Sequence, residues 1–164
     1  MKEVATLDAG PHPFAVAIDP AGHRAFIIYV TAISQGRIAL IDGATDTIAG
    51  AMDVKRGDGS RVPLRVIAVN PNLGPYGHLW TVTSEEDGGQ NQILLIPVEP
   101  MGAPPPVPLD IPAYPLDGIV LDPTTNRVWV TSVRSGQVTV VQDGEPLCRT
   151  PFSAERMFRI RRLP

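Results

Sequence analysis

The sequence predicts an all-β protein built from three copies of one unit. Each copy contains a proline, an apolar run, an Asp-Pro or Asn-Pro step and a run rich in Val and Thr, and the steps are Asp19-Pro20, Asn70-Pro71 and Asp122-Pro123. The steps lie 51 and 52 residues apart, and a fixed period of this length indicates stacked supersecondary units. Short runs of β-branched and aromatic residues alternate with Gly, Pro, Asn and Asp, which predicts strands joined by turns, and no run has a helical period.

The third copy shows the order of elements most clearly. Its first apolar run ends at Asp122-Pro123, as expected of a strand buried on both faces. A turn follows in which Asn126 tolerates a left-handed conformation. Val128-Trp129-Val130 then has the composition of a second strand, and Asp143-Gly144 predicts a tight hairpin turn after the third. We expect strands at residues 118–121, 127–132 and 137–142, with a weaker fourth strand at 146–152.

The first two copies follow the same plan. Insertions fall between the expected strands of the second copy, at Ser84–Gly89 and Pro104–Pro106, where surface loops tolerate them. The expected strands of the first copy are residues 14–18, 24–31, 37–42 and 47–54. Those of the second copy are residues 64–69, 78–83, 92–98 and about 107–111.

Four-stranded antiparallel units at this period are typical of β-propeller blades. The sequence therefore predicts a partial β-propeller of about three blades, with repeats at about 8–54, 58–111 and 112–152. Residues 4–7 stand where the fourth strand of a preceding blade would lie, so we expect them to form an outer strand. Residues 153–164 form a basic C-terminal tail in this division of the chain.

The repeated pattern resembles the YVTN-type β-propeller repeat. Tyr29-Val30-Thr31 spells most of the name-giving motif of that family, and Val128–Ser132 and Leu79–Thr83 are looser versions. Ile41–Thr47 is similar to the usual end of the third strand and the turn after it. The resemblance covers roughly residues 5–152 and implies a propeller fold in a family that is largely bacterial and archaeal, with many members outside the cytoplasm. It implies little about function, because one fold hosts many activities.

Three blades are too few for a closed ring, since propellers have roughly four to eight. An open arc exposes two apolar faces, which are either a liability or an interface. The sequence leaves three alternatives open. The remaining blades belong to a longer or a separate polypeptide; two copies pair into one ring, in line with the preference of homo-oligomers for closed symmetry; or the ends are capped, with Ala154–Pro164 as the candidate cap.

Composition and charge exclude several classes of protein. A net charge of −3 and a pI near 5.5 give no electrostatic footprint for nucleic acid. No apolar run approaches the roughly 20 residues of a transmembrane helix, so we expect no transmembrane segment. Met1-Lys2-Glu3 does not begin a signal peptide, so the expected location is the cytoplasm unless a leader was removed. Cys148 is the single cysteine, which rules out an internal disulfide framework.

The candidate ligand-binding residues lie where the first strand of each copy begins. Phe14, Arg65 and Asp117 occupy one aligned position, five residues before each Asp/Asn-Pro step. Charged residues at an otherwise apolar strand position could face a channel mouth and hold a ligand; the structural alternative is an ion pair between blades. His12 lies in the loop that enters the first strand, but Pro63 and Pro115 take its place in the other copies.

No catalytic or metal motif is present, and we predict no catalytic residue, metal or cofactor. His12, His23 and His78 lack carboxylate or cysteine partners at ligand spacing. Glu85–Gly89 lacks the alternating pattern of a calcium loop, so it is interpreted as a solvated acidic loop. Cys148 is interpreted as a small buried apolar residue.

The sequence thus favours a propeller module that binds or interacts, rather than an enzyme. Its partners would be a second copy, another propeller segment, or a small-molecule or protein ligand. The alternative is part of a propeller enzyme of the lactonase, lyase or quinoprotein dehydrogenase type, with a site at the channel mouth. Arg156, Arg159, Arg161 and Arg162 in the tail could touch an acidic partner or lipid surface. The tail could equally be an edge strand or a disordered end.

Overall fold

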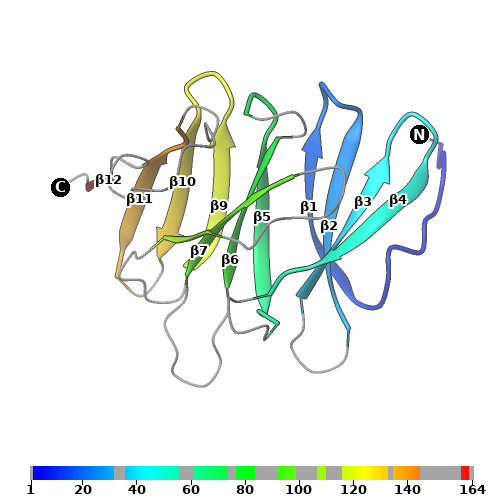
Figure 1. Ribbon diagram of the computed structural model, residues 1–164, viewed down its shortest axis with the longest axis horizontal. Coiled ribbons are helices and arrows are strands. Elements are labelled where there is room, and N and C mark those ends of the chain that lie inside the picture. Colours follow the sequence, from blue (N-terminus) through cyan, green and yellow to red (C-terminus); the bar gives the residue numbers. More distant parts are fainter. Residues whose placement is uncertain are drawn as a thin grey trace, which may run out of the picture.

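The protein is all-β in a computed structural model (Figure 1). The structure describes residues 2–31, 36–55, 61–73, 77–83, 92–98, 107–109, 116–132, 135–144 and 160–162. Every regular element in these ranges is a strand, which confirms the predicted all-β class. None of the described residues forms a helix with the length and hydrophobicity that a membrane span requires.

The strands form three four-stranded antiparallel sheets, each in consecutive chain order. Sheet I contains β1 (Pro13–Asp19), β2 (Arg24–Val30), β3 (Gly36–Asp42) and β4 (Thr47–Asp53). Sheet II contains β5 (Leu64–Asn70), β6 (His78–Thr83), β7 (Ile93–Pro97) and β8 (Val107–Leu109). Sheet III contains β9 (Leu116–Asp122), β10 (Arg127–Ser132), β11 (Gln137–Gln142) and β12 (Ile160–Arg162).

The turn between the first two strands ends in the same way in all three sheets. The residue before the second strand is left-handed each time, with φ of 49° at His23, 88° at Gly77 and 52° at Asn126. Its carbonyl accepts a hydrogen bond from the backbone N–H of the residue that follows the third strand. The donor–acceptor pairs are Gly43–His23 (2.7 Å), Val98–Gly77 (3.1 Å) and Asp143–Asn126 (2.8 Å). The repeat of the sequence is therefore a repeat of backbone geometry.

Sheet II lies between the other two sheets and is buried on both faces. All six residues of β6 are buried, because alternate side chains enter two different cores. The core between sheets I and II is apolar and contains Phe26, Ile28, Ile38, Ile67, Val69 and Leu79, among others. The core between sheets II and III is formed by Ala68, Trp80, Val82, Ile93, Leu95, Val128, Val130 and Val141. The first strands β1, β5 and β9 lie next to one another across these contacts (Figure 1).

One expectation about outer strands is wrong, and the outer strand of sheet III comes from a part of the chain where none was predicted. Residues 4–7 have no strand conformation, and Val4 is 86% exposed. The fourth strand of sheet III is β12, within the basic tail, where Ile160, Arg161 and Arg162 pair with Val141, Val140 and Thr139. This pairing supplies β11 with backbone partners on its outer edge, so the tail provides an edge strand for the sheet. The predicted strand at 146–152, the insertions at 84–89 and 104–106, and Cys148 lie outside the described residues.

Candidate functional site

The first strand of each sheet carries a β-bulge near its start. In β1 the register shifts between Pro13 and Ala15, and in β5 it shifts between Leu64 and Val66. In β9 the pairing passes from Gly118 to Leu116. The residues left out of the pairing are Phe14, Arg65 and Asp117, which are the three aligned residues that the sequence singled out. We call them the bulge row.

A bulge removes one residue from the ladder and re-aims its side chain, and bulges are frequent next to binding sites. The bulge row is accessible: Phe14 is 48% exposed, and the side chains of Arg65 and Asp117 are 48% and 34% exposed. Because β5 lies beside both β1 and β9, the three bulges fall at the same end of adjacent strands. The structure therefore brings a cation and an anion together and places an accessible aromatic residue at the same end of the neighbouring strand.

Arg65 and Asp117 form an ion pair between sheets II and III. The distance from Arg65 Nη1 to Asp117 Oδ1 is 3.7 Å, so the structure forms the inter-sheet ion pair of the structural alternative. Both side chains remain in contact with solvent, and exposed pairs contribute only about 0–1 kcal/mol. A ligand that binds either side chain would therefore lose little free energy by breaking the ion pair.

His12 lies two residues before Phe14, at the entry to β1. It is exposed and has a left-handed φ of 49°. His12 is therefore close to Phe14 of the bulge row in the sequence. The other two histidines lie elsewhere: His23 is in the turn before β2, and His78 begins β6.

A cluster of charged residues lies at the same end of sheet I as Phe14. Asp53 forms ion pairs with Arg37 and Arg61, with N–O distances of 2.6 and 3.2 Å, and it accepts a hydrogen bond from Arg61 Nη2. The Arg37 guanidinium also lies 5.7 Å from the centroid of the Tyr29 ring, within cation–π range. Sequence reasoning did not find this group, because its members come from strands β3 and β4 and from the segment that leads to β5.

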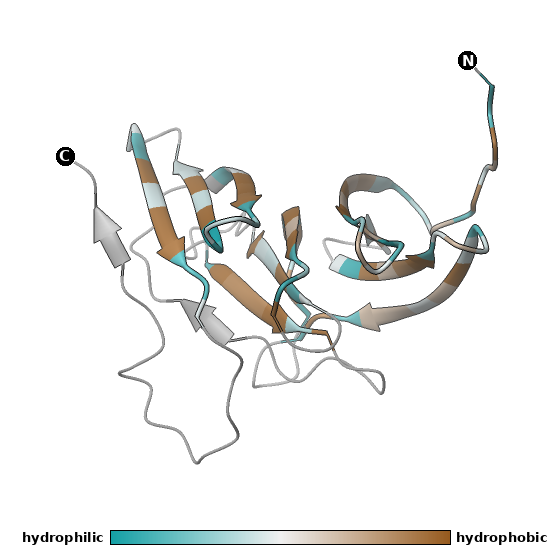
Figure 2. Ribbon diagram, turned by 90° about the horizontal axis from the view of Figure 1, so that it is seen from above, coloured by the Kyte–Doolittle hydropathy of each residue, from teal (hydrophilic) through white to brown (hydrophobic). Residues whose placement is uncertain are grey.

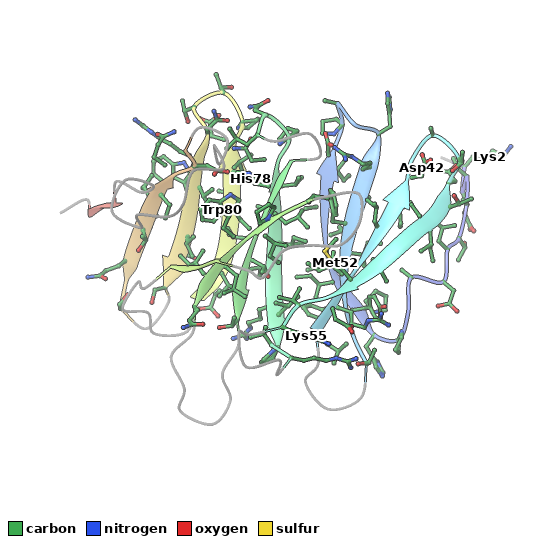
Figure 3. The ribbon with its side chains drawn as sticks, in the orientation of Figure 1. Lys2, Asp42, Met52, Lys55, His78 and Trp80 are labelled. Atoms are coloured by element: carbon green, nitrogen blue, oxygen red, sulfur yellow. The ribbon has the colours of Figure 1, made fainter. Side chains whose placement is uncertain are left out.

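A buried polar network joins sheets II and III. The Asp143 carboxylate accepts hydrogen bonds from Asn70 Nδ2 at 2.9 Å and Trp80 Nε1 at 2.7 Å, both on Oδ2. Its Oδ1 lies 3.2 Å from His78 Nδ1. A carboxylate only accepts, so Nδ1 is assigned as the protonated nitrogen. Figure 3 shows His78 and Trp80 on the side of sheet II that faces β9 and β10.

This network is a structural contact between sheets. The side chains of His78 and Asp143 are 6% and 1% exposed, so no substrate reaches them in this structure. Buried polar groups are tolerated when their partners are satisfied, and here one carboxylate serves three groups. Sequence reasoning interpreted Asp143 only as a turn residue and missed the network.

The alignment of the copies contains a signal for this network. The first copy has Asp19 and Arg24 at the two ends of its first turn, and they pair with each other. The second copy has Asn70 and His78 at these positions, and the amide of Asn70 cannot form an ion pair with His78. The missing carboxylate is supplied by Asp143 of the third copy.

Among the described residues, no group of three His, Cys, Asp or Glu side chains is placed to hold a metal ion. No family model matches the chain, and no curated protein matches it in sequence. Of the solved structures, the Kuenenia stuttgartiensis hydrazine synthase is similar to this chain, with a TM-score of 0.57 and 20% identity over 77% of the chain. The similarity spans 39% of the hydrazine synthase chain. A likeness at this level of identity concerns the fold alone.

Proposed function

We propose that this chain is a β-propeller module of the YVTN type that binds a ligand at the bulge row, without catalysing a reaction. The observation that carries the proposal is the coincidence of three bulges at one repeat position. Backbone irregularities cost pairing energy, and they are retained where they re-aim side chains for use. Three sheets with the same irregularity at adjacent strand ends would form one composite edge.

The chemistry of the bulge row suggests the class of ligand. The guanidinium of Arg65 can bind a carboxylate through two parallel N–H donors. The carboxylate of Asp117 can bind a cation, and the ring of Phe14 offers an apolar surface. A small molecule or peptide segment that carries an aromatic group next to a charge would match all three. The accessible groups of the row lack a histidine hydrogen-bonded to a carboxylate, whereas the His78–Asp143 pair is buried. The described residues therefore favour binding over general acid–base chemistry.

Two simple probes test the proposal: benzoate, which presents a ring and an anion, and benzamidine, which presents a ring and a cation. Binding is measured by NMR chemical-shift titration of the isotope-labelled chain. Because Arg65 and Asp117 neutralise each other, removing one should free the other. We expect Asp117→Asn to weaken benzamidine binding about tenfold. It should also strengthen benzoate binding, but by no more than about fivefold, because the ion pair that it removes is worth only about 0–1 kcal/mol. Arg65→Gln should do the opposite.

Phe14→Ala should weaken both probes, because it removes the shared ring contact. The matched controls are Arg127→Gln and Asp46→Asn, which change exposed charges outside the bulge row and should leave both titrations unchanged. The bulge row is not a binding site if Arg65→Gln and Asp117→Asn change the affinity of both probes in the same way. The same conclusion follows if the probes change the chemical shifts only of residues outside β1, β5 and β9.

A further inference from the structure

The two outermost sheet faces carry exposed apolar side chains at positions that are buried or partly buried in the other sheets. On sheet I, Val16 and Ile18 are 60% and 65% exposed. Their counterparts in sheet II, Ile67 and Val69, are 7% and 6% exposed in the core against sheet I. The apolar type of these residues is thus repeated, while none of the sheets that the described residues form covers them in sheet I. We call Val16 and Ile18 the sheet I face; Phe14 lies in the bulge before them and is not counted in it.

The opposite end of the row shows the complementary pattern. The position of Trp129 in sheet III corresponds to Phe26 in sheet I and Trp80 in sheet II, which are both fully buried. Those two aromatic residues pack against the next sheet, whereas Trp129 is only partly buried. Its cross-strand neighbours Val120 and Val140 share its face, by the register of β10 with β9 and β11. We call Val120, Trp129, Val138 and Val140 the sheet III face; Val120 and Val138 are 61% and 44% exposed.

The two faces correspond to the two sides of the contact that joins neighbouring sheets within the molecule. In both internal contacts, the face that bears Phe26 or Trp80 packs against the face of the next sheet that bears the counterparts of Val16 and Ile18. The sheet III face and the sheet I face each have the residues of one side of this contact, but no sheet of the described residues packs on them. Figure 2 shows sheets I and III at opposite ends of the row, with apolar residues along their strands. One molecule therefore cannot join its own two faces.

We infer that the sheet III face of one molecule packs on the sheet I face of a second copy of this chain. A second copy fits these faces because it presents apolar and β-branched residues at the same repeat positions that the contacts between sheets within one molecule already use. The contact is head-to-tail, so it either closes into a ring or grows without limit. Two copies supply six sheets, within the roughly four to eight of closed propellers, whereas three copies would exceed them. The number of copies rests on the propeller architecture of the proposed function, but the choice of faces does not.

The first test is the mass of the full chain in solution, by sedimentation velocity over a range of concentrations. We expect a species of twice the 17.6 kDa chain mass, with no larger species. Val16→Asp and Val120→Asp each place a charge in one face, and each alone should weaken association about 100-fold or more. Both positions are exposed in the single chain, so folding should be preserved, as checked by far-UV circular dichroism. Val4→Asp is the control, because Val4 is exposed and lies outside the sheets.

Mixing the two face variants distinguishes head-to-tail packing from other arrangements. The Val16→Asp chain keeps its sheet III face and the Val120→Asp chain keeps its sheet I face, so an equimolar mixture should form a species of two chains that neither variant forms alone. A tryptophan emission shift to the blue with rising concentration should accompany association. It should vanish in Trp129→Phe, which leaves Trp80 as the remaining tryptophan.

Two outcomes would overturn the choice of faces, and a third would overturn the closed ring of two copies. A wild-type chain that stays monomeric to millimolar concentration shows that another partner takes these faces. A Val120→Asp chain that still dimerises shows that like faces meet, and growth to large oligomers shows that the contact does not close. None of these outcomes bears on the probe titrations at the bulge row, so the two proposals fail separately.

Discussion

Trp80 donates its indole N–H to the carboxylate of Asp143, 63 residues further along the chain, at 2.7 Å. This hydrogen bond crosses from sheet II to sheet III, and it occurs where both side chains are almost fully buried. Asn70 and His78 converge on the same carboxylate. Sheets II and III are therefore held in register by a polar contact as well as by apolar packing.

Replacing Asp143 should destabilise the fold strongly. Asp143→Ala leaves three buried polar groups without their acceptor, and we expect a loss of about 3–5 kcal/mol in the free energy of unfolding. Asp143→Asn keeps an oxygen for Trp80 and Asn70 and offers an amide to His78 in its other tautomer, so about 1–2 kcal/mol should be lost. Urea denaturation at one fixed protein concentration measures both, with the exposed Asp46→Asn as the control, because asparagine tolerates the left-handed φ of 53° at this position. Equal losses for the Ala and Asn variants would contradict this account.

Gly36 should not tolerate a side chain. A Cβ there would lie 2.6 Å from Leu64 Cγ and 2.9 Å from the Leu64 backbone nitrogen, at the point where sheet I meets sheet II. Gly36→Ala must therefore push the two sheets apart, and we expect a loss of about 1–3 kcal/mol.

Gly50 provides the matched comparison, because a Cβ there would have no heavy atom within 4 Å. Gly50→Ala should be neutral or stabilising by about 0.5 kcal/mol, since alanine restricts the unfolded chain more than glycine does. Thermal unfolding of the two variants side by side gives the comparison. A similar shift in both would mean that the Gly36–Leu64 approach is not a constraint.

Asp122 should make stability depend on pH in the acidic range. The Thr125 hydroxyl and the Thr124 backbone N–H donate hydrogen bonds to its carboxylate, and they lower the pKa of Asp122 below the ordinary value of 3.8. The folded chain then binds fewer protons at this site than the unfolded chain. The contribution of Asp122 is therefore present above pH 3.8 and is lost as the pH falls through its folded pKa.

Thr125→Ala removes the larger cause of this shift, so the pKa of Asp122 should rise toward its ordinary value. NMR titration of the Asp122 side chain in both proteins measures the change. Thr124→Ala is the control, because Thr124 lowers the pKa of Asp122 mainly through its backbone N–H, which survives the substitution, and its side chain is the smallest of the causes. An Asp122 pKa that is the same in Thr125→Ala and in the wild type would assign the shift to the backbone instead.

The Arg65–Asp117 pair should contribute little to stability. Its side chains are largely exposed and its charged atoms are 3.7 Å apart, so Arg65→Gln and Asp117→Asn should each change the free energy of unfolding by less than about 1 kcal/mol. The double variant should show almost no coupling between the two positions, as a double-mutant cycle in urea measures. A coupling above about 1.5 kcal/mol would mean that the pair is a structural element and not a contact that a ligand can open.

Most of the strand order follows from the sequence, because each turn has its own chemical signature. Asp19-Pro20, Asn70-Pro71 and Asp122-Pro123 mark the first turn of each sheet, and the strands begin and end within a few residues of the predicted positions. The fourth strand of sheet III could not be placed in this way. Its three residues, Ile160–Arg162, carry more charge than a typical strand, and only their pairing with β11 identifies them.

The candidate site was predicted by position but not by geometry. The alignment picked out Phe14, Arg65 and Asp117, yet a bulge is a property of the pairing between two strands and leaves little trace in either strand alone. The Asp143 network was missed for a related reason: its four members are spread over two copies. Asp143 follows a strand and precedes a glycine, so its local sequence indicates a turn, while its side chain serves a neighbouring sheet.

The residue after the third strand has a different identity in each sheet, although its backbone hydrogen bond is the same. In sheet III it is Asp143, in sheet II it is Val98, and in sheet I it is Gly43. A seam between two molecules would place Gly43 where the internal contacts have a side chain. Such a seam would depend on apolar contact alone, so it should tighten on warming from low temperature and with sulfate, and respond little to acid. Subunits should then exchange between rings while each chain stays folded.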